Sequence, residues 1–271
     1  MNKLLKANFS RLKREWSLWI VAGVTLAVAI AKIFDSYGYL ENIVLDDLIF
    51  EMIPFIGIMY SLFIALYLGK EYGDKTMRNK LIVGHKRENI YLSNYIVCLV
   101  GALFVYSMTF LGSFCVGVPL VGGWQGEIST LITYILMGVF FTASLASILT
   151  MLCMLCSKHA LSAVLAIVLT FLLMLIASII YNALGEPEMT SEMHMTLNGI
   201  EIGDPVPNPV YVSGGQRTVY EFLMQFLPTG QGILMANDEV TNPVLNIIYS
   251  IITTVMVNLC GIIAFKKKDL K

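Results

Sequence analysis

Six long stretches with few or no charged side chains divide the chain. A helix needs about 18 or more apolar residues to cross a bilayer core of about 30 Å, and each stretch approaches or exceeds that length. The stretches are Trp16 to Ala31 with an extension to Phe34, Met52 to Gly69, Asn89 to Gly126, Ile128 to Ser157, His159 to Gly185 and Val240 to Phe265. The pattern predicts one all-α integral membrane domain over residues 1–271, with six transmembrane helices.

The segment before the first span has the pattern of an amphipathic helix. In residues 1–16, apolar side chains recur at i, i+4, i+7 and i+11, as Leu5, Phe9, Leu12 and Trp16. Basic residues occupy much of the remaining surface, which is typical of a helix lying in the membrane interface. The first span is not a cleaved signal peptide, because its apolar part is too long and no small-residue cleavage site follows it.

Composition supports the membrane class, and charge predicts the orientation. The chain is 57% hydrophobic and 14% charged, whereas soluble domains carry roughly 25% charged residues. Nearly all of its 18 Lys and Arg residues lie in residues 1–15, in residues 70–88, at Lys158 and after Phe265. Cytoplasmic loops are enriched in Lys and Arg, so both termini are predicted to be cytoplasmic and residues 182–243 extracellular, in the cell membrane.

Residues 69–94 form the largest predicted cytoplasmic connection and contain the densest cluster of charge. Gly73 and Asp74 predict a turn and a helix N-cap, Lys75 to Val83 a short helix, and Gly84 its C′ residue. Met77 and Leu81 share one face of that helix, with Ile82 beside them, while Lys75, Arg78 and Lys80 point elsewhere. An apolar knob with basic surroundings favours docking into a groove on a partner, and a basic loop lying on anionic lipid is the alternative.

The stretch "EYGDKTMRNKLIVGHKRENIYLSN" resembles the cytoplasmic loop of ABC exporter permeases of the type-2 membrane-domain family. In that family a Glu-x-x-x-Gly-Thr-like element precedes a short coupling helix. The matching positions are Glu71, Gly73, Thr76, Arg87 and Tyr91, and Asn94 stands where the family often has Lys.

The resemblance implies an exporter subunit without catalytic, cofactor or metal sites of its own. Two copies of an ATPase would bind ATP and Mg, and a second permease copy would form a homodimer in the lipid bilayer, with no role for nucleic acid. The ATPase-coupling residues implied are Glu71, Asp74, Lys75, Met77, Arg78, Leu81 and Ile82. The family also implies a pair of short re-entrant outer helices, which "VYEFLMQFLPTGQGILMA" resembles, with breaks at Pro228 and Gly230.

The residues themselves provide no energy source for transport. The Gly-x-x-x-x-Gly-Lys-[Ser/Thr] phosphate-binding loop is missing from the sequence. Within the predicted spans the one acidic residue is Glu51, at the outer edge of the second, so a proton relay is not indicated. Cys153, Cys156 and His159 have the spacing of metal ligands, but no fourth ligand is apparent and small buried residues are the simpler interpretation.

Rows of small residues at four-residue intervals permit close helix packing. Gly23, Ala27 and Ala31 form one row on the first span, and Ser162, Ala166 and Thr170 form another on the fifth. The resemblance implies that these two spans form the homodimer seam, whereas the sequence alone is equally compatible with packing inside one chain.

A wall of the substrate path is predicted on the second and fifth spans. Its candidate residues are Tyr60, Ser61, Tyr67, Met174, Ser178 and Tyr181. Such a wall would be amphipathic. The resemblance implies an amphipathic substrate, with antimicrobial or other peptides as a candidate class. The outer segment 186–215 is polar and contains a candidate Asn198-Gly199 hairpin. The alternative function is a membrane scaffold or sensor that recruits a cytoplasmic partner through the basic loop.

The distribution of basic residues yields a direct test of orientation. A single cysteine placed at Ser191 should react with a membrane-impermeant maleimide added to intact cells, and one placed at Asn79 should not. Permeabilised cells, in which both positions should react, provide the control. Labelling of position 79 alone in intact cells would reverse the predicted topology.

Overall fold

The structure is a computed structural model that describes residues 1–39, 44–156, 158–191, 193–196 and 199–268. Six of its helices have the length and apolar composition to cross a membrane. They are α2 (Trp16–Tyr39), α4 (Ile53–Gly73), α6 (Arg87–Val121), α7 (Ile128–Leu155), α8 (His159–Gly185) and α11 (Pro243–Lys267). The prediction of six spans is therefore confirmed. At 35 residues, α6 is about 52 Å long and exceeds the bilayer core.

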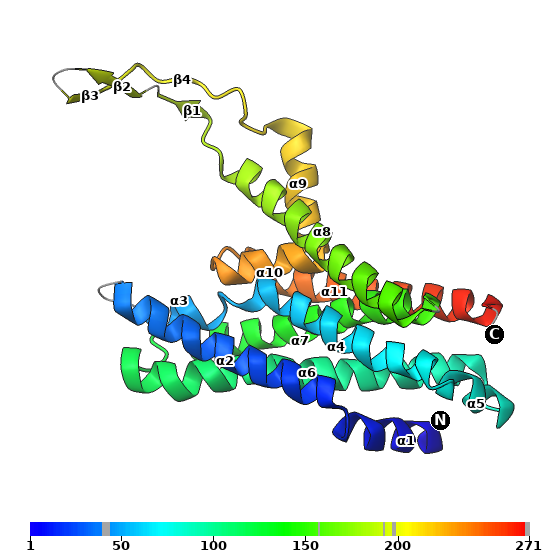
Figure 1. Ribbon diagram of the computed structural model, residues 1–271. Helices are drawn as coiled ribbons and strands as arrows, with labels where there is room; N and C mark the ends of the chain where they lie inside the picture. Colours follow the sequence, from blue (N-terminus) through cyan, green and yellow to red (C-terminus); the bar gives the residue numbers. More distant parts are fainter. Residues whose placement is uncertain (40–43, 157, 192, 197–198, 269–271) are drawn as a thin grey trace.

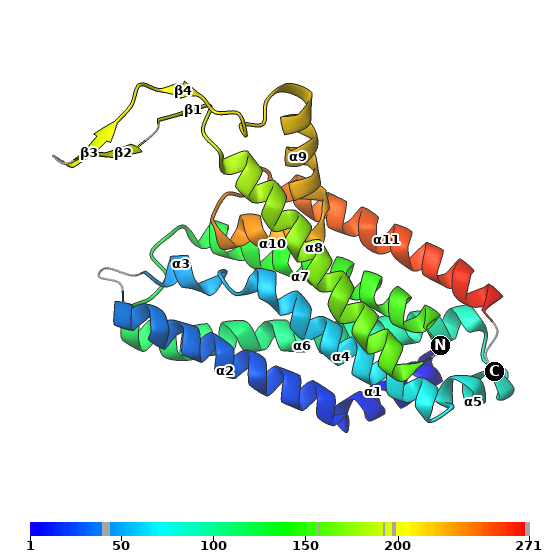
Figure 2. The same cartoon turned by 45° about the horizontal axis from the view of Figure 1, so that its top comes forward.

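The helix α4 forms the centre of the bundle. It packs against α2, α6, α7 and α8, and Figures 1 and 2 show it between α2 and α8. Its side chains Ile53, Tyr60, Phe63 and Leu68 are all fully buried in the core. Any movement of α4 must therefore disturb its packing with four other spans.

Two short helices lie at the end of the bundle that carries both chain termini, which is called the terminal end below. They are α1 (Asn2–Lys13) and α5 (Thr76–Ile82), and Figure 2 shows them near the N and C labels. The placement of α5 and the termini on one side agrees with the predicted order of the loops. At the other end, α3 (Leu45–Ile49) precedes α4.

The capping of α5 differs from the prediction. Lys75, with a left-handed φ of 55°, is the N-cap residue, and no side chain caps the helix. Asp74 instead follows the last turn of α4, because α4 continues to Gly73 and the left-handed Lys75 then turns the chain into α5. The predicted C′ residue is confirmed, since Gly84 has a φ of 93°, a conformation that glycine adopts without strain.

A narrow arm extends from the opposite end of the bundle (Figures 1 and 2). Its strands β2 (Met193–Thr196) and β3 (Gly199–Ile202) pair antiparallel, with Thr196 opposite Gly199. The strands β1 (Met189–Thr190) and β4 (Val206–Pro207) pair at its base. The predicted hairpin is confirmed in part. Gly199 was expected in the turn but is the first residue of β3, and residues 197–198, which include Asn198, lie outside the described residues.

Two short helices connect the arm to the last span, as the sequence predicted. They are α9 (Gly214–Phe226) and α10 (Pro228–Ala236), with Pro228 in the first turn of α10. Pro lacks an N–H and therefore suits a helix start. The predicted break at Gly230 is wrong, because this residue lies within α10. A Cβ there would overlap the carbonyl oxygen of Met224, so Gly230 allows α10 to approach the end of α9.

Candidate functional site

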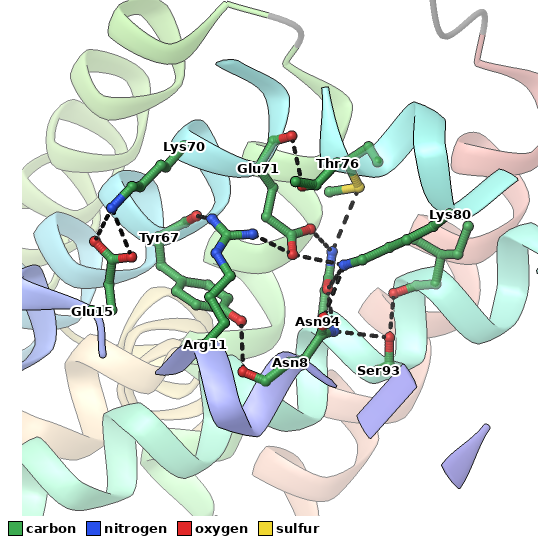
Figure 3. A network of polar contacts seen from close by, with 12 residues as sticks. Asn8, Arg11, Glu15, Tyr67, Lys70, Glu71, Thr76, Lys80, Ser93 and Asn94 are labelled. Carbon is green, nitrogen blue, oxygen red and sulfur yellow. Dashed lines mark hydrogen bonds and ion pairs between the residues drawn. The ribbon is translucent and has the colours of Figure 1, made fainter. Parts of the chain in front are cut away.

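The side chain of Glu71, in the last turn of α4, is fully buried at the terminal end. Arg11 Nη1 of α1 and Lys80 Nζ of α5 each donate to its Oε1 atom at 2.7 Å. Asn94 Nδ2 of α6 donates to Oε2 at 2.8 Å. Figure 3 shows these three donors converging on the carboxylate. One side chain thus joins four helices.

Two further side chains, Asn8 and Ser93, complete the polar cluster around Glu71. Asn8 Nδ2 donates to Asn94 Oδ1 at 2.8 Å and to Ser93 Oγ at 3.2 Å. Lys80 Nζ donates to Asn8 Oδ1 at 2.9 Å. The six residues Asn8, Arg11, Glu71, Lys80, Ser93 and Asn94 are called the Glu71 cluster below. Its hydrogen bonds run between helices and fix their relative positions.

The burial of the Glu71 cluster makes its pairing obligatory. A carboxylate removed from water is strongly destabilised unless charged partners and hydrogen bonds replace its hydration. Here the side chains of Arg11 and Lys80 are only 22% and 14% exposed. Pairs of this kind add little net stability over an apolar core, but removal of one member leaves an uncompensated buried charge. The cluster therefore specifies how α1 and α5 are seated.

Additional contacts hold α1 against α4. The Arg11 guanidinium lies 5.0 Å from the centre of the Tyr67 ring and donates to the Tyr67 carbonyl at 3.2 Å. The Tyr67 hydroxyl donates to the Asn8 carbonyl at 3.3 Å, and Lys70 pairs with Glu15 at 3.3 Å. Polar contacts therefore hold α1, and Glu15 just after it, against α4.

The predicted apolar face of the N-terminal helix is partly wrong. Leu12 is buried and Leu5 and Phe9 pack beside the core, but Trp16 belongs to α2 and is 77% exposed. The buried residues of α1 are Leu4, Asn8 and Leu12. Asn8 lies four residues from both Leu4 and Leu12 and therefore shares their face of the helix. This polar residue on an apolar face was the available signal for the Glu71 cluster, and the predictions above do not include it.

The predicted coupling residues separate into two groups. Glu71 and Met77 are buried inside the chain, and Leu81 packs partly against its core. Asn94 Nδ2 contacts Met77 Sδ at 3.6 Å. The exposed members are Asp74, Lys75, Arg78 and Ile82. The sequence predicts that Met77 forms part of the exposed apolar knob. This prediction is wrong, because α5 turns the Met77 side chain inward.

The exposed apolar surface at the end of α5 consists of Ile82 and Val83. They are 71% and 76% exposed. Arg78 and Lys86 are exposed nearby in the sequence. This exposed apolar tip lies next to cations, and another side of the same helix is bound to Glu71. These are the properties of a docking surface.

The two rows of small residues have different environments. Gly23, Ala27 and Ala31 are exposed on α2. Ser162, Ala166 and Thr170 are instead buried inside the chain, where α8 packs on α4. A Cβ at Gly57 of α4 would lie only 3.2 Å from the Thr170 methyl group. The prediction of a dimer seam through the α8 row is therefore wrong, because this row is used for packing within one chain.

The predicted substrate wall does not form. Tyr60, Ser61 and Tyr67 are fully buried because neighbouring helices surround α4. The Tyr60 and Thr142 hydroxyls hydrogen-bond at 3.0 Å. Met174 and Ser178 are half-buried on α8, and Tyr181 donates to Glu239 at 3.1 Å. Tyr181 borders a cavity of about 990 Å³ beside α9 and α10, so the six residues do not line one space.

Lys268, the last residue that the structure describes, is held at the same end of the bundle as the Glu71 cluster. Lys268 Nζ donates to the Tyr72 hydroxyl and to the Met154 carbonyl, each at 2.9 Å. Burial lowers the pKa of Lys268 to about 8, against a weaker opposing effect of Cys156. Within the described residues, no group of three or more His, Cys, Asp and Glu side chains could hold a metal ion.

The role of Glu71 as the buried link is tested by replacing its charge. Glu71→Gln leaves the Arg11 and Lys80 charges without a carboxylate and should cost about 3–5 kcal/mol of stability. Thermal unfolding of the purified protein in detergent measures the loss. Adding Lys80→Met should recover part of it, because one buried cation is then removed.

Glu221→Gln is the matched control. It breaks the i,i+4 ion pair between Arg217 and Glu221, whose side chains are 37% and 51% exposed. Surface pairs of this kind contribute about 1 kcal/mol or less of stability. Equal losses for Glu71→Gln and Glu221→Gln would contradict the structural role assigned to Glu71.

The chain was also compared with known proteins. A family model described as "ABC-2 family transporter protein" matches residues 4–176. This range includes all six residues of the Glu71 cluster. No curated protein matches the chain.

Proposed function

The chain belongs to the ABC-2 family of transporter proteins as a multi-pass membrane subunit, and we propose that it exports an amphipathic substrate with energy from a separate ATPase chain. The ATP and Mg are bound by that partner. The observation that carries this proposal is the exposed apolar tip of α5, formed by Ile82 and Val83. It is the part of α5 best placed to enter a groove on a partner.

The construction of α5 supports a role in transmitting force. Lys80 of α5 binds Glu71 at 2.7 Å, and the Thr76 hydroxyl donates to the Glu71 carbonyl at 3.0 Å. Displacement of α5 by an ATPase would therefore pull on the last turn of α4. Since Glu71 also binds Arg11, α1 would move with it, and α4 would transmit the change to the spans it contacts.

The orientation and the surface helices follow from the same proposal. The terminal end is cytoplasmic, because it contains α5 and both termini and nearly all of the basic residues. The helix α1 lies along the cytoplasmic membrane surface. The helices α9 and α10 are re-entrant on the outer side, where they border the 990 Å³ cavity that opens beside α8.

Two copies of the chain are proposed to meet along α2. Its exposed row Gly23, Ala27 and Ala31 presents little side-chain bulk, which permits close approach of helix backbones. Among the described residues, and apart from the adjoining backbone of α2, no heavy atom lies within 4 Å of where a Cβ at Gly23 would stand. The row is therefore free within the chain to contact a second α2.

Ile82→Asp tests the coupling surface. A charge at the centre of an apolar contact should lower ATPase binding by about 1–3 kcal/mol, which is roughly 5- to 150-fold. The complex is purified after co-expression with the ATPase, and both its stoichiometry and its substrate-stimulated ATP hydrolysis are measured. Ile82 is preferred to Leu81 because Leu81 also packs against the core.

Val210→Asp is the matched control, because Val210 is 62% exposed next to the outer arm. It should retain the partner and normal hydrolysis. A folded Ile82→Asp protein that binds its ATPase and transports at the normal rate would contradict the coupling surface and favour a loop that contacts only lipid.

Ala27→Trp tests the dimer seam. The bulky ring should separate the two backbones and reduce the fraction of cross-linked dimer in membranes. Val168→Trp on α8 is the control, because Val168 is 46% exposed and lies outside the α2 row. Full dimer formation by the Ala27→Trp protein would place the seam on another helix.

A further inference from the structure

A cavity of about 380 Å³ lies between α2 and α4, at the end of the bundle opposite the termini. This volume falls in the range of about 300–1,000 Å³ typical of small-molecule sites. Its walls are almost entirely apolar, and Val28 and Phe55 at its border are 37% and 49% exposed. In a membrane these side chains would face lipid, so the cavity is open to the bilayer.

An ion pair borders this apolar cavity. Lys32 Nζ of α2 lies 2.8 Å from Glu51 Oε1, with side chains 33% and 40% exposed. Charged residues in spans usually pair with each other and mark binding or transport sites. Both charges are partly accessible, so each can also contact a charged group of a ligand.

One polar group in the cavity wall lacks a partner. Thr109 of α6 lines the cavity and is 1% exposed, and its hydroxyl has no hydrogen-bond partner among the described residues. The other threonine of the wall differs, since Thr25 donates to the Val21 carbonyl at 2.8 Å. A buried hydroxyl without a partner is destabilising.

We propose that this cavity binds a zwitterionic membrane lipid. One acyl chain occupies the apolar space, a lipid oxygen accepts a hydrogen bond from Thr109, and the head group lies at the ion pair. There the lipid phosphate contacts Lys32 and its ammonium contacts Glu51. The inference goes beyond the proposed function and does not rest on it, because lipid binding requires neither an ATPase nor transport.

The site is separate from the proposed dimer seam. At 100° per residue, Val28 and Lys32 lie on a different side of α2 from Ala27 and Ala31. A second copy seated on the small row would therefore leave the cavity open. The lipid is favoured over the second copy because the small row proposed to seat the second copy faces away from the cavity.

The proposal is tested with the full chain in bilayer nanodiscs that contain phosphatidylethanolamine with a photoreactive diazirine on one acyl chain. After illumination, mass spectrometry should find adducts enriched at Phe55 and Met59 over Phe171, an exposed side chain of α8. Equal labelling at these positions would mean ordinary contact with bulk lipid and would overturn the proposal. Cross-links from the cavity to a second copy would overturn it as well.

Two variants test the cavity itself. Val28→Phe should reduce adducts at Met59 about tenfold, because the ring fills the space. Thr109→Val keeps the side-chain shape and should reduce the Met59 adducts about threefold. The effect is small because a single hydrogen bond in a membrane contributes little free energy. Val168→Phe on α8 is the matched control and should change nothing. Unchanged labelling in both cavity variants would contradict the proposal.

The head-group assignment has its own readout, which is competition between unlabelled lipids of equal chain length. The natural chain should prefer phosphatidylethanolamine over anionic phosphatidylglycerol. Glu51→Gln should reverse this preference, because Lys32 then acts alone, and Lys32→Gln should weaken binding of both lipids. A preference that neither variant changes would exclude the ion pair as the head-group site.

Discussion

The placement of α1 and α5 depends on the buried carboxylate of Glu71. Its two oxygens receive donors from Arg11, Lys80 and Asn94, which belong to three different helices. A charge in this position cannot be left unpaired, so the helices that supply its partners must be present together. The same requirement makes the surface formed by α5 a rigid extension of α4.

This arrangement explains why α5 is short and yet firmly placed. At seven residues it is well below the length of about 12–15 residues at which isolated helices become stable in water. Its position comes from tertiary contacts, with Met77 buried inside and Lys80 paired to Glu71. Only Ile82 and Val83 then remain as exposed apolar groups. The proposed docking surface and the internal anchors thus lie on different sides of a single helix.

The transmembrane bundle shows a related division. The small residues of α8 are used to pack α8 closely on α4, whereas those of α2 are left exposed. On the other edge of α2, imperfect packing against α4 leaves the cavity next to Lys32 and Glu51. One helix therefore presents a proposed contact for a second copy and, on another side, a proposed contact for lipid. Both can be occupied at the same time.

Features that depend on local composition follow from the amino-acid sequence alone. Apolar length set the six spans, Pro228 set the boundary between α9 and α10, and Gly84 set the end of α5, because each acts through the backbone or through transfer into lipid. Periodicity also identified side chains that share a face, such as Ser162, Ala166 and Thr170.

Which of those faces point inward depends on how the helices pack together. The small-residue rows of α2 and α8 have the same spacing, but the first is exposed and the second is buried. The spacing of residues along a helix does not identify the neighbour against which the helix packs. Polar residues showed this most clearly. Glu71 belongs to the predicted cytoplasmic connection and Asn8 to the predicted interfacial helix, but both are buried because charged and amide partners from distant segments replace the water they lose. That compensation exists only when the helices have assembled.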